Sequence, residues 1–377
     1  MGDNRGVNTS IDSSSLTSAL KRHIDEAIRA AGGWLAFDRF MELALYTPGL
    51  GYYANGVPKF GAMPESGSDF VTAPELSPLF GWALAQQVAQ ALEESGTDQI
   101  WEFGAGTGAL ARQLLDALGS RVKRYTIVDL SGDLRARQKQ ALESFGEQVA
   151  WAEQLPDAIE GVIVGNEVLD AMPVKLVHRR GGERDGVWHE RGVVLADGGG
   201  FAWEDRVTDL RPPIGIPGPQ DYLTELQPQG EAFMRTIADR LKRGAAIFID
   251  YGFPEAEFFH PQRHMGTLVC HRAHQVDFDP LADVGLKDIT AHVNFTGMAL
   301  AAQDAGLQVL GYTSQAHFLL NCGIAAEMQT REQKQRSQAA KLVMEHEMGE
   351  LFKVLMLGAG APWLPRGFSH GDRTHRL

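Results

Sequence analysis

This sequence has few cysteines, no long apolar run and no excess of basic residues. The 377 residues include 2 cysteines, Cys270 and Cys322, which cannot form a CxxC site or a disulfide framework. No apolar run approaches the ~20 residues that a helix needs to cross a bilayer. The polar start MGDNRGVNTSIDSSS lacks the apolar stretch of a signal peptide. These absences predict a cytoplasmic protein without a membrane span.

The charge balance is acidic, with a formal net charge of -13. This disfavours nucleic acid as a partner, because phosphate binding needs a basic face. It suits a cationic ligand or a basic peptide segment. Histidines gather late in the chain without an HxxxH or HExxH pattern, so no metal site is expected; they are His264, His271, His274 and His292. The composition fixes no oligomeric state and allows a homodimer.

Apolar strands alternate with amphipathic helical patterns in the central part of the chain. The strand-like segments are QIWEF, RYTIVDL, QVAWA, GVIVGNEV and AAIFIDYG. Such an alternation predicts an α/β fold with a parallel sheet covered by helices on both faces.

The sequence divides into segments of different character. We expect a disordered tail at 1–15, a helical region with a Gly- and Pro-rich lid loop at 16–90, an α/β core at 91–175 and 220–322, an inserted antiparallel β-ribbon at 176–219, a C-terminal helix at 323–358 and a second tail at 359–377.

A glycine cluster, EFGAGTG, follows the first predicted core strand. No lysine follows its last glycine, so it is not a P-loop. The loop Gly104–Gly108 is one residue tighter than the dinucleotide fingerprint G-x-G-x-x-G. Glu102 stands just before it and would repel a diphosphate but suit a cationic amino acid group. The cluster therefore predicts a phosphate-free ligand.

The next predicted strand ends in Asp129, about 20 residues further on, where an acidic side chain can accept hydrogen bonds from ribose hydroxyls. An acidic strand end, a GxGxG loop and a second acidic strand end together match S-adenosylmethionine, which combines a nucleoside with a zwitterionic tail. The alternative is a glycine turn that serves only helix–sheet packing.

The segment VGNEVLDAMPV lies at the carboxyl end of the fourth predicted strand, where a methyl acceptor would sit. Glu167 and Asp170 are one helical turn apart, so both carboxylates can face the same space. They could hold a guanidinium by charge-assisted hydrogen bonds, and Asn166 could accept from the substrate or fix the loop. In the alternative, Asp170 caps the next helix and Glu167 bonds backbone.

Asp250 and Tyr251 end the fifth predicted strand at the same rim of the sheet. We assign both to the candidate catalytic group, against the alternative that Asp-Tyr-Gly only forms a turn.

Six stretches, taken in order, resemble the MidA-like S-adenosylmethionine-dependent methyltransferases, a family that includes an arginine-methylating mitochondrial complex I assembly factor. They are GSDFVTAPELSPLFG, EFGAGTGAL, VDLSGDLRARQ, GNEVLDAMPV, IDYG and DITAHVNF. The resemblance runs from about Trp34 to Gly323. It implies a Rossmann-like class I methyltransferase core with an N-terminal helical region, a β insertion and a C-terminal helical part.

The resemblance also implies roles for individual residues. On the cofactor side it implies Glu102, Gly104, Ala105, Gly106, Gly108, Asp129, Leu130 and Ser131, with Thr72, Pro74 and Glu75 over the amino acid end of the cofactor. On the substrate side it implies Asn166, which also faces the cofactor, together with Glu167, Asp170 and Pro173. The chain departs from the family pattern in having Ala105 for proline, Asp129 for glutamate and NEVLDAMP for NEFFDALP.

The leading hypothesis is a protein arginine N-methyltransferase that uses S-adenosylmethionine and a protein acceptor. One alternative is an S-adenosylmethionine-binding assembly factor or chaperone with little catalysis. Another is a small-molecule N- or O-methyltransferase, and a nicotinamide oxidoreductase is the last.

Overall fold

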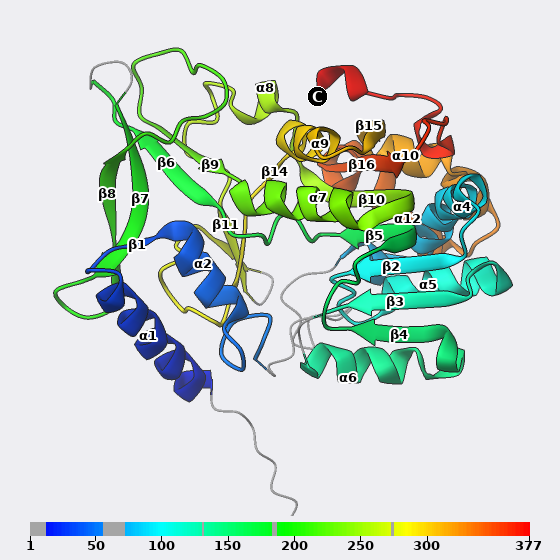
Figure 1. Ribbon diagram of the computed structural model, residues 1–377, viewed down its shortest axis with the longest axis horizontal. Helices are drawn as coiled ribbons and strands as arrows, with labels where there is room; N and C mark the ends of the chain where they lie inside the picture. The colour runs from blue at the N-terminus through cyan, green and yellow to red at the C-terminus, as the bar shows by residue number, and fades with distance from the viewer. Residues whose placement is uncertain (1–12, 56–71, 130–131, 183–186, 273–274) are drawn as a thin grey trace, which may run out of the picture.

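The central sheet dominates the computed structural model, which describes residues 13–55, 72–129, 132–182, 187–272 and 275–377 (Figure 1). The strand order is β15 (Gln308–Ser314), β16 (Phe352–Ala359), β10 (Leu241–Phe253), β5 (Ile159–Asn166), β2 (Gln99–Phe103), β3 (Arg124–Val128) and β4 (Val149–Ala152), with the short β14 (Val293–Asn294) beside the end of β10. The strands from β10 to β4 are mutually parallel, whereas β16 is antiparallel to both of its neighbours.

Helices cover both faces of this sheet. One face carries α4 (Pro78–Ser95), α5 (Ala109–Leu118), α10 (Gln315–Asn321), α11 (Ile324–Gln329) and α12 (Gln333–Val343), and the other carries α7 (Pro228–Arg240) and α9 (Phe295–Asp304). Helix α6 (Gly132–Ala141) follows β3.

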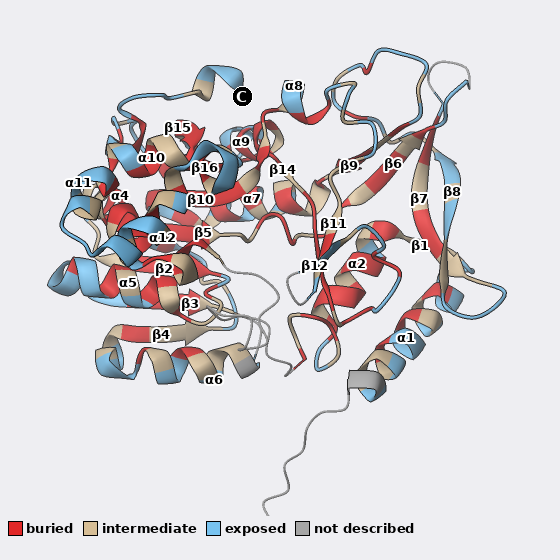
Figure 2. Ribbon diagram, turned by 180° about the vertical axis from the view of Figure 1, so that it is seen from behind, coloured by how far each residue is buried: buried red, intermediate tan, exposed pale blue. Residues whose placement is uncertain are grey.

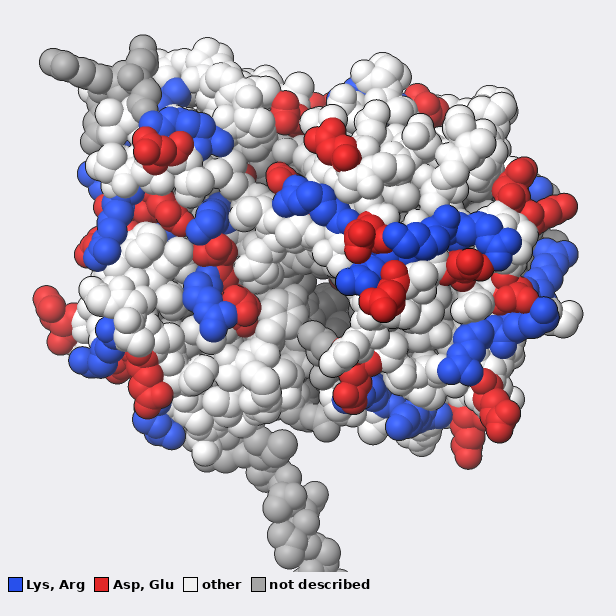
Figure 3. Space-filling view, in the orientation of Figure 1, with Lys and Arg blue, Asp and Glu red and all other residues white. Residues whose placement is uncertain are grey.

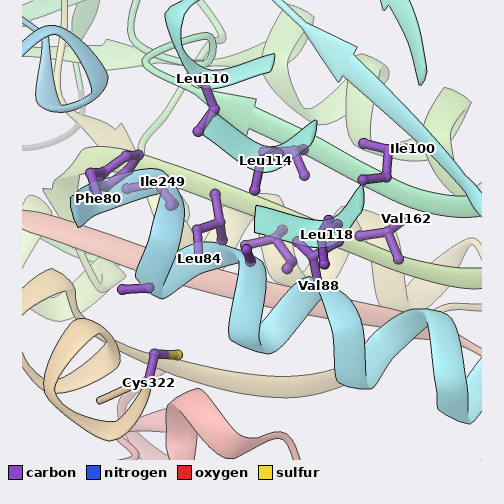
Figure 4. Packing of buried hydrophobic residues seen from close by; sticks show 14 of the residues in the cluster. Phe80, Leu84, Val88, Ile100, Leu110, Leu114, Leu118, Val162, Ile249 and Cys322 are labelled. Atoms are coloured by element: carbon purple, nitrogen blue, oxygen red, sulfur yellow. The ribbon is translucent and has the colours of Figure 1, made fainter. Parts of the chain in front are cut away.

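Figure 4 shows the first face, where Phe80, Leu84 and Val88 of α4 pack against α5 and the strands. Each such buried side chain stabilises the fold by roughly 1.5–3 kcal/mol. The strands read as continuous apolar runs because both of their faces are buried.

The expected C-terminal helix over 323–358 is correct only for its first part. Helices α11 and α12 are present, but a short π-helical turn at Glu345–Gly349 ends the helical region, and β16 follows. Apart from Lys353, the run FKVLML is apolar at every position, so its periodicity cannot separate a buried strand from a buried helix. The segment forms a strand because its backbone pairs with β10 on one side and β15 on the other, which buries Val354 and Leu355.

A second lobe is built on an antiparallel sheet. Its strands are β1 (Leu35–Ala36), β7 (Trp188–Leu195), β6 (Lys175–Arg179) and β9 (Tyr222–Leu226), with β8 (Phe201–Thr208) paired to β7. Helices α1 (Ser13–Ala30) and α2 (Phe37–Tyr46) pack on this sheet, as the buried residues in Figure 2 show. The region 16–90 is therefore divided, because α4 belongs to the central sheet.

Two segments within the α/β core expected at 220–322 lie outside the central sheet. Residues 222–226 form β9 of the antiparallel sheet. The segment 254–290 contains α8 (Glu255–Phe258) and a three-stranded sheet of β12 (Gln275–Asp277), β11 (Val269–Arg272) and β13 (Asp288–Thr290).

The C-terminal end differs from a simple tail. Residues 1–12 lie outside the described residues, and 13–15 already belong to α1. At the other end, Phe368 is buried against Phe318, with ring centroids 5.5 Å apart, and the Arg373 N–H donates to the Tyr312 carbonyl at 2.6 Å. The segment 360–377 is thus packed on the core. Among the described residues, no helix is both long and apolar enough to cross a membrane.

Candidate active site

A cavity of about 1210 Å³ lies between the central sheet and the second lobe. The carboxyl ends of β2, β3, β5 and β10 form one wall, and residues of α2, β11 and β13 form the other. Figure 3 shows the molecule hollowed between the lobes, with basic and acidic side chains interspersed around it. The cavity sits where an open parallel sheet binds its ligands, and it exceeds the ~300–1,000 Å³ of a usual small-molecule site.

The glycine loop between β2 and α5 needs its glycines. Gly104, Gly106 and Gly108 have φ angles of 64°, 52° and 87°, a region that favours glycine. A Cβ on Gly104 would lie 2.9 Å from Val168 Cγ2, whereas one on Gly106 would meet no heavy atom within 4 Å. Gly104, Ala105 and Gly106 line the cavity, and Gly108 begins α5 behind it.

Glu102 lies at the floor of the cavity, before the glycine loop. Its side chain is buried, and the Tyr125 hydroxyl donates to Oε2 at 2.8 Å. Burial raises the pKa of Glu102 to about 8, and the charge of Asp129 adds to this effect. The carboxyls of Glu102 and Asp129 therefore interact electrostatically within one part of the cavity lining.

Asp129 follows β3 directly and lines the cavity, and Gln138 Nε2 donates to its Oδ2 at 2.7 Å. The predicted neighbours Leu130 and Ser131 lie outside the described residues. Glu153 and Leu155, just beyond β4, also line the cavity. Neither residue belongs to the predicted site, although the rule that ligands meet strand carboxyl ends also applies to 149–152.

The segment Thr72, Pro74 and Glu75 lies against the glycine loop and lines the cavity. The Thr107 hydroxyl donates to Glu75 Oε1, and Gln113 Nε2 donates to the Pro74 carbonyl at 2.7 Å. These contacts attach helix α3 (Ala73–Leu76) to α5. They hold the segment beside the glycine loop, in the wall of the cavity.

A strained turn follows β5. Glu167 has a positive φ of 54°, which is rare for a residue with a side chain. Its N–H donates to the Ile249 carbonyl at 2.9 Å, and Asn166 Nδ2 donates to its Oε1 at 2.9 Å. Burial, followed by the charge of Asp170, raises the pKa of Glu167 to about 8. The turn thus holds a carboxyl in the cavity wall.

Asp170 lies one turn further on and pairs with Tyr251. The Tyr251 hydroxyl donates to Asp170 Oδ2 at 2.5 Å, while burial raises the pKa of Asp170 to about 6. The Tyr251 ring packs edge-on against His292 and Phe352, with centroids 5.2 and 5.4 Å away. Asn166, Glu167, Asp170 and Tyr251 all line the cavity, so the structure brings these predicted residues together.

Asp250 has a different position from the one expected of a catalytic residue. It is fully buried and does not line the cavity. Its Oδ2 accepts the N–H groups of residues 168, 169 and 170 at 3.1, 2.9 and 3.2 Å, and its Oδ1 accepts that of Tyr251. Asp250 therefore holds the turn that carries Glu167 and Asp170. Pro173 also lies outside the cavity lining.

The second lobe contributes residues that the sequence analysis did not identify. The Tyr53 hydroxyl donates to both Asp288 carboxyl oxygens at 2.8 Å, and the Tyr46 hydroxyl donates to the Ala171 carbonyl at 2.8 Å. The two tyrosine rings stack at 5.5 Å. All three side chains line the cavity beside Asp170. Their only sequence signal was the resemblance of DITAHVNF, which contains Asp288.

Buried polar atoms without a hydrogen-bond partner cluster on this side of the cavity. Within the described residues they include Asn166 Oδ1, Asp170 Oδ1, Thr290 Oγ1 and His292 Nδ1. Burial lowers the pKa of His292 to about 4, so its imidazole is neutral at pH 7. No lysine or arginine is among the described lining residues. The site is rich in acceptors and fits a ligand rich in N–H donors.

The strand order and the glycine loop define a class I methyltransferase, and the fold class expected from the sequence is confirmed. A family of S-adenosyl-L-methionine-dependent methyltransferases matches residues 83–313, and the chain belongs to this family.

Similar proteins agree with this assignment. A protein from Burkholderia thailandensis, with a crystal structure bound to S-adenosyl-homocysteine, is 47% identical with a TM-score of 0.93; the match covers 98% of this chain and 99% of that one. The protein arginine methyltransferase NDUFAF7 homologue of Caenorhabditis elegans, a mitochondrial protein, is 26% identical over 88% of this chain and 83% of its own length. Human NDUFAF7 is 26% identical, and the match covers 94% of this chain and 85% of the human protein.

The cofactor is S-adenosylmethionine, and the residues present fit it. The loop leaves open space at Gly106, where a backbone can approach a ligand closely. Glu102 and Asp129 supply carboxyls, and no described cationic side chain lines the cavity to meet a diphosphate. When bound, the cofactor supplies an electrophilic methyl group.

Proposed function

We propose that this chain is a protein arginine N-methyltransferase whose acceptor guanidinium enters beside Glu167 and Asp170. The observation that supports this most is the set of unpartnered acceptor atoms on that side, at Asn166, Asp170 and His292. A guanidinium presents five N–H donors and no acceptor, so it can satisfy several of them at once. The names of the NDUFAF7 relatives support the same choice.

The residues of the turn account for the handling of the proton. The pKa of an arginine exceeds ~12, so its proton must leave as the new N–C bond forms. Glu167 and Asp170 would orient the planar group by charge-assisted hydrogen bonds. A bound cation favours the ionised form of Glu167, which then receives the departing proton. Asp250 keeps the turn in place through its backbone hydrogen bonds.

The test adds the purified chain and methyl-labelled S-adenosylmethionine to an extract from cells that lack the gene for this chain. We expect label in protein, and methylarginine after acid hydrolysis. Methyllysine or another methylated residue would contradict the arginine assignment. Label confined to the low-mass fraction would indicate a small-molecule methyltransferase. Tight cofactor binding without any label would indicate an assembly factor.

A further inference from the structure

Gln138 of α6 contacts three segments of the cofactor side from behind the cavity. Its Nε2 donates to the Gly106 carbonyl at 3.0 Å and to Asp129 Oδ2 at 2.7 Å, and its Oε1 accepts from Trp151 Nε1 at 3.0 Å. The side chain is fully buried and does not line the cavity. It therefore acts on a ligand only through the residues it holds.

The three partners match the chemistry of a glutamine amide. The amide has two N–H donors and one carbonyl acceptor, and its partners are two acceptors and one donor. This match also fixes the orientation of the amide. A glutamate would turn two acceptors towards other acceptors, an asparagine is one methylene shorter, and a leucine offers no hydrogen bond. The position thus selects glutamine.

We propose that Gln138 is a positioning residue for S-adenosylmethionine, which fixes the Asp129 carboxylate for the ribose and joins it to the glycine loop and to β4. The need for such a contact follows from the acidic surroundings. Glu102 lies close enough to Asp129 for their charges to interact, and no lysine or arginine lines the described cavity wall. A neutral amide donor holds the carboxylate in one rotamer without the excess charge that would attract phosphate ligands.

Calorimetric titration with S-adenosyl-homocysteine tests this inference without any methyl acceptor, so the arginine proposal can fail independently. Gln138→Leu should weaken binding by about tenfold to hundredfold, the range of a lost hydrogen bond to a charged group. Gln138→Glu should weaken it further at pH 8 and recover in part at pH 6, where the introduced carboxyl can carry a proton and donate. Gln140→Leu, an exposed position on the same helix, is the control.

A double-mutant cycle separates positioning from simple stability. We compare the fold-loss of S-adenosyl-homocysteine affinity that Gln138→Leu causes in two backgrounds. This loss should be at least about fivefold smaller in the Asp129→Ala background than in the wild type. Equal losses in both backgrounds, or wild-type affinity in Gln138→Leu, would overturn the proposal. Should Gln138→Leu fail to fold, the pH-dependent recovery of Gln138→Glu provides the decision, and an affinity that does not change with pH would count against it.

Discussion

The cofactor side and the acceptor side of the cavity are built in opposite ways. On the cofactor side, the carboxyl of Asp129 and the carbonyl of Gly106 are held by hydrogen bonds within the chain. On the acceptor side, Asn166 and Asp170 keep buried oxygen atoms without partners. A buried polar atom without a hydrogen-bond partner lowers the stability of the fold. The acceptor side carries this cost at Asn166 and Asp170, whereas Asp129 and Gly106 on the cofactor side do not. The difference teaches that the chain satisfies the polar groups of one half by itself, and it supports our proposal that a substrate rich in N–H donors satisfies those of the other.

The largest expected effect comes from closing the cofactor side. Gly106→Val places a β-branched side chain at φ 52° in space that lines the cavity. We expect at least about a hundredfold loss of S-adenosyl-homocysteine affinity, because blocking a close backbone approach removes more than one hydrogen bond. Calorimetry measures it.

Gly119→Val is the matched control for this change, since Gly119 has φ 53° with nothing within 4 Å and lies outside the cavity lining. It should carry a similar folding cost and bind normally. Retained affinity in Gly106→Val would contradict the loop assignment.

The next largest expected effect is a loss of methyl transfer without a loss of cofactor affinity. Glu167→Gln keeps the shape of the turn but removes the negative charge and the proton acceptor. Methyl transfer should fall by about a hundredfold, within the range of a lost general base, while cofactor affinity changes by less than about twofold. Single-turnover transfer and calorimetry measure the two quantities. Glu160→Gln, on the same strand but exposed, should change neither. Unaltered turnover in Glu167→Gln would make Glu167 structural.

The last expected effect concerns the stability of the ligand-free protein. Burial raises the pKa of Glu167 from about 4.5 to about 8, so between these values the folded chain holds a proton that the unfolded chain has released. The free energy of unfolding therefore falls as pH rises through this window, by at most about 1.4 kcal/mol per pH unit for this group. Urea unfolding from pH 5.5 to 8 should show a shallower fall in Glu167→Gln. Parallel curves for both proteins would exclude the shifted pKa.

The cofactor side could be predicted because its signals are local. The glycine loop and Asp129 each follow an apolar strand, and parallel strands bring their carboxyl ends together whatever the details of packing. The S-adenosylmethionine cofactor expected from them is confirmed.

The acceptor side depends on contacts that no local pattern records. Tyr53 and Asp288 are separated by 235 residues and meet only because distant segments pack together within the second lobe. Asp250 looked like a rim residue, but four backbone N–H groups hold its carboxylate behind the turn. The strand β16 differs from the predicted helix because the apolar run over 354–357 fits either structure once it is buried.

The position of β16 sets the timing of assembly during synthesis. This strand lies between β10 and β15, yet it leaves the ribosome after both of them. Until then a nascent chain presents two unfilled strand edges, which are sites for wrong pairing with other chains. A product that stops before residue 352 would lack this strand and would leave the edges of β10 and β15 unpaired.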